Sequence, residues 1–249
     1  MKILQLNVWT GRMKGALTRF LRENEYDVVC LEEAVWSERK PLHLAHFFDT
    51  VDGLKAAGGF EYEVRQSNWG TRFADGSAVM EQGNVILSHI PIVSSEVIPI
   101  HGTYSDAMEW GEDWEAKVKA QGWNAVKAKL ENGLTVVAHH GYWDRDPLGD
   151  ETSIECARKV ADAVRDETGP VLICADMNLI AESPAMRELD FLTDLTAETG
   201  TKQTLMNLKF VKDVACDHIW ISKDIKWSNF KVHKEVVSDH AAVSVEIEF

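Results

Sequence analysis

Hydrophobic and polar positions alternate along most of this chain in patterns that predict many strands and fewer helices. Residues 2–9 alternate as expected for a strand, whereas residues 171–174 form a continuous apolar run, typical of a strand buried on both faces. The predicted strands cover residues 2–9, 26–31, 60–69, 84–88, 92–100, 123–130, 134–140, 171–178, 216–221, 225–233 and 241–249.

Helical spacing of apolar residues predicts three helices and an insertion. One helix is expected around residues 16–21, a second from near 41 to 57, and a third over 152–167, where apolar residues form one stripe. Residues 103–121 combine tryptophans with many acidic residues, and they predict a helical insertion.

The order of these elements predicts the architecture. Residues 123–130 and 134–140 are expected to form a hairpin across an Asn-Gly turn, and 84–88 is expected to pair with 92–100. Both halves of the chain combine strands with a helix, which indicates two sheets packed face to face. We therefore predict an α/β fold, a four-layer α/β/β/α sandwich of two mixed β-sheets with helices outside, as a single domain over residues 1–249.

Composition and charge narrow the classes of function. The chain has 249 residues, of which 45% are hydrophobic, so a large core can be buried. The formal net charge is −14, from 26 basic and 40 acidic residues, which disfavours a broad basic surface for duplex nucleic acid. A local metal site can offset this charge, so a nucleic-acid substrate stays open.

Cysteine usage and the absence of long apolar runs predict the location. The four cysteines form no C-x-x-C pair and lie in apolar segments, so we expect reduced core residues rather than a zinc site or disulfides. No charged leader with a following apolar run is visible, and no apolar run reaches the roughly 18 residues of a membrane span. We expect a monomeric, cytoplasmic protein with no membrane span.

Polar side chains stand at the ends of several predicted strands. Asp176 and Asn178 lie two positions apart, so in an extended segment their side chains point the same way. An Asx turn that closes the strand explains the same pair equally well. The other polar strand ends are Asn7, Glu33, His140, Asp217, Asp239 and His240.

Each of these residues has an ordinary explanation as a turn former, a solvated strand end or a surface histidine. Their joint occurrence favours a second explanation, in which they converge on one end of a sheet. Carboxylate and amide oxygens would then suit a hard cation such as Mg²⁺ or Mn²⁺, and neighbouring imidazoles would bind a phosphate.

Seven short motifs resemble, in the same order, those of the endonuclease/exonuclease/phosphatase superfamily of deoxyribonuclease I-like, metal-dependent phosphoesterases. This superfamily includes pancreatic deoxyribonuclease, abasic-site endonucleases, neutral sphingomyelinases and inositol polyphosphate 5-phosphatases, and the resemblance implies the same four-layer fold. The motifs are LNV at 6–8, DVVCLEE at 27–33, GNVILS at 83–88, VAHH at 137–140, ADMN at 175–178, DHIW at 217–220 and SDH at 238–240.

The resemblance implies a role for each matching metal or water ligand. Glu33 resembles the principal metal-binding glutamate, and Asn7 and Asp239 resemble supporting metal ligands that act directly or through water. Asp176 resembles the aspartate that orients and deprotonates the attacking water. Asn178 resembles the amide that holds this aspartate and a phosphoryl oxygen.

The resemblance also implies a phosphate-binding pair of histidines. His240 resembles the histidine that binds the scissile phosphate, and Asp217 resembles the carboxylate that holds its other ring nitrogen. His140 resembles the histidine on the opposite side of the phosphate, which stabilises or protonates the leaving oxygen. The resemblance leaves open whether Asp176 or His240 takes the proton of the water.

Four positions near these motifs depart from the family pattern. Glu32 stands where the family usually has Gln, which adds a negative charge close to the metal. His139 and Gly141 flank His140 where Thr and Leu are usual, and Ala175 stands where Gly is common.

The expected activity is Mg²⁺-dependent, or Mn²⁺-dependent, hydrolysis of a phosphate ester by in-line attack of water, with a phosphodiesterase or nuclease as the leading hypothesis. Alternatives are a phosphatase of a small phosphomonoester, a sphingomyelinase-like lipid phosphodiesterase, a catalytically silent binding relative and a nucleic-acid scaffold. An exposed apolar surface near the site would favour lipid, a basic groove nucleic acid, and a small closed pocket a small ester.

Loop residues near the predicted site are candidates for substrate contact. Residues 143–146 directly follow His140, and the insertion at 103–121 is either a solvated helix or a rim of the site. Arg12 and Arg72 are candidate phosphate ligands, with an ordinary surface arginine as the alternative in both cases.

Overall fold

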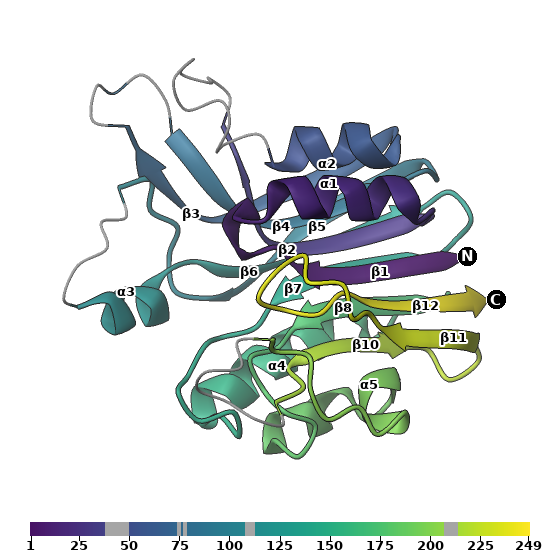
Figure 1. Cartoon of the computed structure of the whole chain (residues 1–249). Helices are drawn as coiled ribbons and strands as arrows, with labels where there is room; N and C mark the ends of the chain where they lie inside the picture. The colour runs from purple at the N-terminus through teal and green to yellow at the C-terminus, as the bar shows by residue number, and fades with distance from the viewer. Residues whose placement is uncertain (38–49, 74–75, 77–78, 108–112, 207–213) are drawn as a thin grey trace.

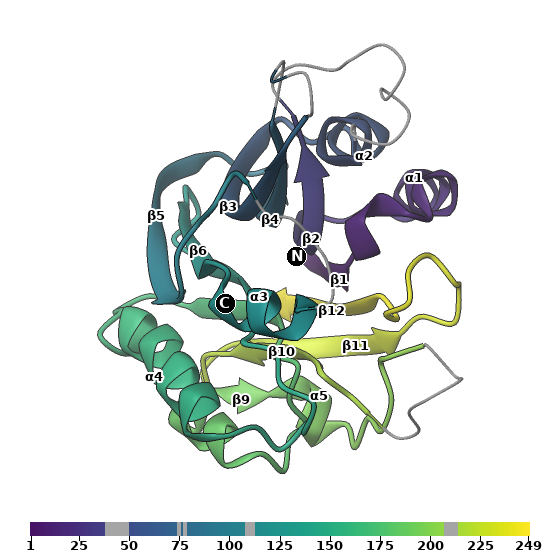
Figure 2. The same cartoon turned by 90° about the vertical axis from the view of Figure 1, so that its left-hand side faces the viewer.

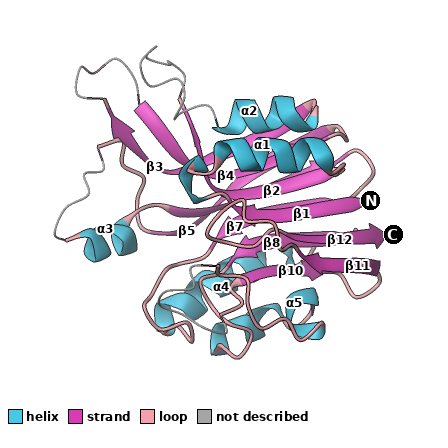
Figure 3. Ribbon diagram, viewed as in Figure 1, coloured by secondary structure: helices cyan, strands magenta, loops and turns pink. Residues whose placement is uncertain are grey.

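The chain folds into two β-sheets that face each other, with helices on the outer faces (Figure 1). Helices α1 (Lys14–Glu23) and α2 (Thr50–Gly58) cover one side, and α4 (Glu151–Arg165) and α5 (Leu195–Glu198) lie on the other (Figure 3). The predicted four-layer α/β/β/α sandwich is therefore confirmed. The computed structural model describes residues 1–37, 50–73, 76, 79–107, 113–206 and 214–249.

Each sheet has six strands, and both sheets are mixed. The first sheet contains, in order across it, β11 (Lys226–Val232), β12 (Val243–Glu248), β1 (Lys2–Asn7), β2 (Val28–Trp36), β4 (Val79–Ser88) and β3 (Tyr62–Arg72). The second sheet contains, in order across it, β5 (Ile92–His101), β6 (Trp123–Leu130), β7 (Thr135–His140), β8 (Val171–Asp176), β10 (Asp217–Ile221) and β9 (Thr193–Asp194).

Three apolar layers hold the sandwich together. The middle layer lies between the sheets and includes Ile3 and Leu172, which are fully buried. On one outer face, Leu17 and Phe20 of α1 pack on the first sheet, and on the other, Val160 of α4 packs on the second sheet. The apolar stripes predicted for these two helices are thus the faces that they bury.

Parallel pairs of strands bring the predicted site residues to one end of the sandwich. In the first sheet β1 is parallel to β2, and Asn7 lies opposite Glu32. In the second sheet β7 is parallel to β8, and His140 lies opposite Asp176. Because parallel strands end at the same edge of a sheet, each pair presents its terminal polar side chains together.

Strand β2 does not end at Glu32 and Glu33, as the sequence predicted, but continues to Trp36. Its pairing with β4 shifts between Leu31 and Ala34, which marks a β-bulge. Glu33 lies in this bulge with a φ of 51°, a left-handed conformation that is uncommon for a residue other than glycine. The bulge lets a carboxylate leave the strand sideways without ending the sheet.

The predicted pairing of residues 84–88 with 92–100 is wrong. Strand β4 pairs with β2 and β3 in the first sheet, whereas β5 pairs with β6 in the second. The short connection at Pro91 therefore carries the chain from one sheet to the other. An apolar pattern defines each strand but does not specify its partner, so the adjacent strands looked like a hairpin.

Shorter elements complete the described chain. They are the 3-10 helices η1 (Trp9–Gly11) and η2 (Pro184–Leu189), and helix α3 (Trp114–Ala120), which is the described helical part of the predicted insertion. The start of the helix predicted from near residue 41 and residues 108–112 of the insertion lie outside the described residues. Within the described part of the chain, no helix is both long and apolar enough to cross a membrane.

Candidate active site

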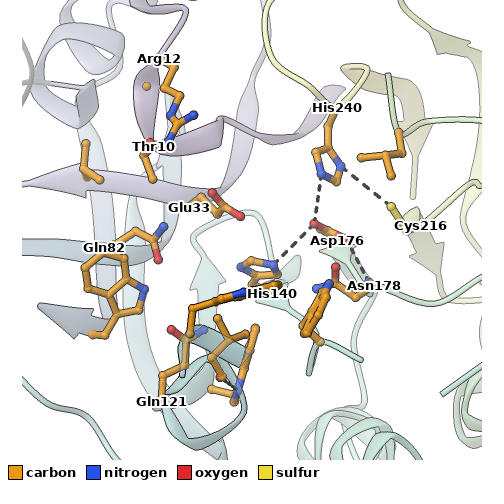
Figure 4. Close-up of a pocket in the computed structure, with 18 of the residues that line it drawn as sticks. Thr10, Arg12, Glu33, Gln82, Gln121, His140, Asp176, Asn178, Cys216 and His240 are labelled. Atoms are coloured by element: carbon orange, nitrogen blue, oxygen red, sulfur yellow. Dashed lines mark hydrogen bonds and ion pairs between the residues drawn. The ribbon is translucent and has the colours of Figure 1, made fainter. Parts of the chain in front are cut away.

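A cleft opens at the end of the sandwich where β1, β7 and β8 finish and β2 bulges. Five of the predicted site residues line it: Glu33, His140, Asp176, Asn178 and His240. Figure 4 shows both histidines turned toward Asp176. Asn7 and Asp217 lie directly behind the cleft and are hydrogen-bonded to residues that line it.

Asp176 is the centre of the arrangement. Its Oδ2 lies 3.6 Å from Nε2 of His140 and 3.7 Å from Nε2 of His240, and it accepts a hydrogen bond of 2.9 Å from Nδ2 of Asn7. The carboxylate is only 1% exposed, so its charge is screened little by water. Two imidazoles and one amide therefore converge on a single carboxylate oxygen.

His240 is held from behind by Asp217. Its Nδ1 lies 2.9 Å from Oδ2 of Asp217, which leaves Nε2 facing the cleft. Burial alone would lower the pKa of His240, but Asp217 and Asp176 outweigh it and hold this pKa well above its usual value. The same partnership lowers the pKa of Asp217, against the effect of its own burial.

Asp217 is itself fixed by residues that sequence reasoning missed. Gln5 donates from Nε2 to Oδ1 of Asp217 at 2.9 Å, and Oγ1 of Thr204 accepts from the backbone N–H of Asp217 at 3.1 Å. Gln5 is fully buried in β1, two positions before Asn7, so an interior polar residue on a core strand was the available signal. Nothing local marks Thr204, because its contact joins distant segments.

Glu33, rather than Glu32, points into the cleft. Asn7 donates from Nδ2 to Oε1 of Glu33 at 3.3 Å as well as to Asp176. Oδ1 of Asn7 faces away, because it accepts the backbone N–H of Trp9 at 2.9 Å. In this geometry Asn7 orients the two carboxylates through its amide nitrogen.

Asp239 does not line the cleft itself, but it directly precedes His240 and interacts electrostatically with Glu33. Burial raises the pKa of its carboxyl group; His240 opposes the shift, and Glu33 adds to it through charge repulsion. Two carboxylates that repel each other in a partly buried position are a suitable donor pair for a divalent cation with oxygen ligands. The residues therefore fit the metal that the sequence predicted.

A second donor group overlaps this one. Asp176, Cys216 and His240 each offer one atom, and within the described residues these atoms lie within 4.8 Å of one another. Burial raises the pKa of the Cys216 thiol, with further increases from Asp176 and Asp217, and a thiol that keeps its proton is a weak metal ligand. Glu33 and Asp239 are the better match to Mg²⁺ or Mn²⁺.

The loop after β8 forms an Asx turn and also contributes a side chain to the site, the two explanations that the sequence left open. Asn178 has a φ of 54°, and its backbone N–H donates to Oδ1 of Asp176 at 3.0 Å, which is an Asx turn. Its side chain also lines the cleft, where Nδ2 donates to the Gly141 carbonyl at 2.9 Å. The turn and the site are therefore the same feature, although β8 ends at Asp176 rather than at residue 178.

The structure explains why glycine stands at position 141, where the family usually has Leu. A Cβ atom there would lie 2.4 Å from the backbone oxygen of Met177, closer than real contacts allow. The Gly141 N–H also donates to the Asp176 carbonyl at 2.7 Å. The ends of β7 and β8 thus approach so closely that only glycine fits beside His140.

The other three departures, Glu32, His139 and Ala175, are buried and do not line the cleft. Burial, together with Asp176 and Asp217, raises the pKa of Glu32 well above its usual value, although Gln5 donates to it at 3.0 Å. Burial lowers the pKa of His139 to about 4, despite its contact with a backbone carbonyl. This rise in pKa favours the protonated, uncharged form of Glu32, which is close in shape to the glutamine usual in the family.

Aromatic and paired charged residues form the rim on the α3 side. The ring centroids of Trp114 and Trp143 lie 5.3 Å apart, and both residues line the cleft. Ion pairs Lys119–Asp144 and Arg145–Glu115 fasten α3 to the segment after His140. Residues 143–145 therefore lie where the sequence placed them, beside the site.

The two arginines predicted as candidate phosphate ligands, Arg12 and Arg72, have different surroundings. Arg12 lines the cleft (Figure 4). Its guanidinium carbon lies 4.7 Å from the centroid of the Trp9 ring. Arg72 pairs with Asp106 instead. Sequence reasoning also missed polar and aromatic lining residues, namely Thr10, Gln82, Gln121 and Trp123.

A family model described as the endonuclease/exonuclease/phosphatase family matches residues 4–240. The chain belongs to this family. The resemblance in the sequence motifs is thereby confirmed. Members of the endonuclease/exonuclease/phosphatase family are hydrolytic phosphoesterases and generally use divalent metals.

Solved structures of family proteins share the fold. One from Leptotrichia buccalis C-1013-b is 18% identical, with a TM-score of 0.71 over 100% of both chains. One from Beutenbergia cavernae DSM 12333 is 16% identical, with a TM-score of 0.70 over 100% of this chain and 71% of that one. The mannosyl-6-phosphatase Bt3783 of Bacteroides thetaiotaomicron VPI-5482 is 15% identical, with a TM-score of 0.69 over 100% of both chains. No curated protein matches the sequence.

Proposed function

We propose that the protein is a Mg²⁺-dependent phosphodiesterase, with Mn²⁺ as an alternative cofactor. The observation that carries this proposal is the convergence of His140 and His240 on one buried oxygen of Asp176, at 3.6 and 3.7 Å. A water bound to that oxygen would face a phosphate held between the two imidazoles. Such an arrangement is suited to in-line hydrolysis of a phosphate ester.

The proposed reaction uses the chain's own groups at each step. Asp176 orients the attacking water and accepts its proton while the water oxygen bonds to phosphorus. His240, held by Asp217, and Asn178 donate hydrogen bonds to the phosphoryl oxygens, where negative charge accumulates. The ester P–O bond then breaks, and His140 protonates or stabilises the leaving oxygen.

A divalent cation fits beside these groups. Glu33 and Asp239 would hold it, with Asn7 orienting Glu33 through its amide. When bound, the cation supplies Lewis-acid stabilisation of charge on a phosphoryl oxygen.

The shape of the cleft favours a diester over a small monoester. The lining residues come from both sheets, from α3 and from the start of α1, so the site is an extended cleft rather than a small closed pocket. A diester carries a substituent on each side of the scissile phosphate, and an extended cleft has walls on which both can rest.

We further propose that residues 1–249 act as one domain in a monomeric cytoplasmic protein. Support for a reducing compartment comes from the four cysteines, which are buried and free. The two sheets also share one apolar layer, which favours a single folding unit.

Steady-state hydrolysis tests this function. Bis-p-nitrophenyl phosphate and p-nitrophenyl phosphate are offered to the wild-type protein with Mg²⁺, with Mn²⁺ and with EDTA. The proposal expects metal-dependent cleavage of the diester that exceeds cleavage of the monoester. Preference for the monoester would instead support a phosphatase, and diester cleavage that persists in EDTA would contradict the metal requirement.

A further inference from the structure

Helix α1 carries a concentration of positive charge next to the cleft. Residues 12–22 include four basic side chains and no acidic one, in a chain whose net charge is −14. The four residues are Arg12, Lys14, Arg19 and Arg22, of which all but the partly buried Lys14 are exposed. Such a local reversal of charge needs a physical reason, because like charges on one helix face repel each other.

This basic face is continuous with the active-site cleft. Lys14 and Gly15 line the cleft, and they also line a second hollow that runs along α1 past Thr18 to Arg22. The rise of an α-helix places Arg22 about 12 Å beyond Lys14. A small phosphate ester bound at Asp176 does not extend that far, whereas a chain of phosphates does. Glu23 closes the far end of the hollow.

The basic side chains on the two sides of the cleft differ in whether they form ion pairs. On the α3 side, Lys119 and Arg145 are neutralised by Asp144 and Glu115. On the α1 side, Arg19 and Arg22 form no ion pair with any residue that the structure describes. Figure 2 shows α1 and α3 as separate helices that lie apart from each other. Cations left unpaired beside a phosphoesterase site are available to the phosphates of a ligand.

The opposite wall offers aromatic surface. Trp114 is 44% exposed and lies 5.3 Å from Trp143, with an angle of 47° between the rings. Large apolar rings that remain half exposed at a cleft are suited to stacking against flat groups. The bases of a duplex already stack on one another, so such rings favour unpaired bases.

We propose that the α1 hollow is a phosphate-binding extension of the cleft, and that its ligand is single-stranded nucleic acid. A positively charged groove for the backbone combined with aromatic side chains for the bases is the combination that binds such strands. In this arrangement one base stacks at Trp114 and Trp143, the scissile phosphate lies at Asp176, and later phosphates follow α1. The inference rests on the proposed phosphodiesterase function, whose substrate class it specifies.

Fluorescence anisotropy tests the inference. A labelled single strand of about 12 nucleotides, as oligo-dT or oligo-rU, is titrated with protein in EDTA, between about 50 and 200 mM salt. Replacing both arginines (Arg19→Gln with Arg22→Gln) should weaken binding roughly tenfold and reduce the slope of log K against log salt by about 1.4. Trp114→Ala should weaken binding roughly tenfold with an unchanged salt slope.

Two matched variants separate a site from a general effect of charge. The control variant Lys223→Gln with Lys226→Gln removes the same charge around the turn that joins β10 to β11, at the end of β10 away from the cleft. It should bind like wild type. Arg19→Lys with Arg22→Lys keeps the charge and should retain the salt slope. Equal losses in the Lys223/Lys226 variant, or wild-type binding by the Arg19→Gln/Arg22→Gln variant, would overturn the inference.

The remaining outcomes are also decisive. A wild-type protein that ignores both strands but sediments with phosphatidylserine vesicles would replace nucleic acid by a membrane surface. Cleavage of bis-p-nitrophenyl phosphate without any contribution of α1 to strand binding would sink this inference alone. Strand binding that depends on α1, in a protein that cleaves no diester, would contradict the proposed function and leave the binding site standing.

Discussion

At the scale of single residues, function depends on side chains that other buried groups hold in place. His240 reaches the cleft from the segment before β12, yet its orientation comes from Asp217 at the start of β10. Asp217 in turn is held by Gln5 of β1. Three distant parts of the chain therefore fix one imidazole, which is how a precise site is built without a bound ligand.

This chain of contacts predicts the effect of Asp217→Asn. The amide lacks the charge that stabilises the His240 imidazolium and does not fix the same tautomer. We expect kcat for bis-p-nitrophenyl phosphate to fall by about 10²–10⁴-fold with a smaller change in KM, because Asp217 does not touch the substrate. A rise in KM with kcat preserved would contradict this positioning role.

A second buried histidine predicts a dependence of stability on pH. His218 is fully buried, its Nδ1 lies 2.8 Å from Oδ2 of Asp194, and its Nε2 lies 3.1 Å from the Leu179 carbonyl. Burial alone would lower the pKa of His218, but Asp194 and the backbone acceptors raise it. The imidazolium thus stabilises the folded state fully below about pH 6.5, the value in an unfolded chain, and this stability is lost as pH rises through the higher folded pKa.

Asp194→Asn should therefore destabilise the protein most at low pH. We expect a loss of about 1.5–3 kcal/mol in urea denaturation near pH 6, which shrinks as the pH approaches 9. Asparagine still accepts the N–H groups of Thr196 and Ala197 that Asp194 caps, so helix α5 is retained. Asp150→Asn is the control, because Asp150 caps α4 by accepting the Ser153 N–H, and it should show a loss that does not vary over this range.

The polar residues at strand ends were predictable because a charged or amide side chain after an apolar strand is visible in the sequence. His140 and Asp176 end their strands, and Glu33 follows the apolar run of β2 within its bulge. The structure brings the three residues together. Gln5 and Thr204 were missed for a different reason. Their partners lie far away along the chain, and only the folded sheet order makes them neighbours.

At the scale of elements, local irregularities place the site residues. The bulge in β2 turns Glu33 toward the cleft, and the Asx turn after β8 adds Asn178 to the same wall. Periodicity located both strands but predicted their ends two or more residues away. A bulge preserves the apolar pattern on both sides of it, so the pattern alone does not reveal that the strand continues.

The pairing of β4 and β5 shows a second limit. The predicted ranges fall within both strands, although β4 begins at Val79 rather than at residue 84. The short connection between them favoured a hairpin. The choice of sheet depends on which apolar face finds a complementary layer, and this is decided by contacts with β2 and β6. The hairpin of β6 and β7, with its Asn-Gly turn, was correct because the turn itself specifies the pairing.

The close approach of β7 and β8 makes a prediction at this scale. Gly141→Ala should destabilise the protein by about 1–3 kcal/mol in urea denaturation, since its Cβ would meet the Met177 carbonyl at 2.4 Å. Gly15→Ala on α1 is the matched control, because nothing lies within 4 Å of its Cβ. We expect the control to stabilise the protein by about 0.5–1 kcal/mol, and two changes of the same sign would contradict this account.

At the scale of the whole molecule, one topology explains why a strongly acidic chain can act on an anionic substrate. The sandwich gathers its site at the ends of two parallel strand pairs, where carboxylates and imidazoles meet. Net charge predicted only that a broad basic surface is absent. It did not predict the basic face of α1, because a sum over the chain hides how charge is distributed.

Asp176→Asn tests the central claim most directly, through kcat for bis-p-nitrophenyl phosphate in saturating Mg²⁺. Asparagine keeps the shape of the side chain but does not accept the proton of the attacking water. We expect a loss of about 10²–10⁴-fold, with a cooperative unfolding transition that shows an intact fold. Asp190→Asn, an exposed change outside the cleft, should leave kcat unchanged. A folded Asp176→Asn protein that keeps wild-type kcat would contradict the assignment of this site.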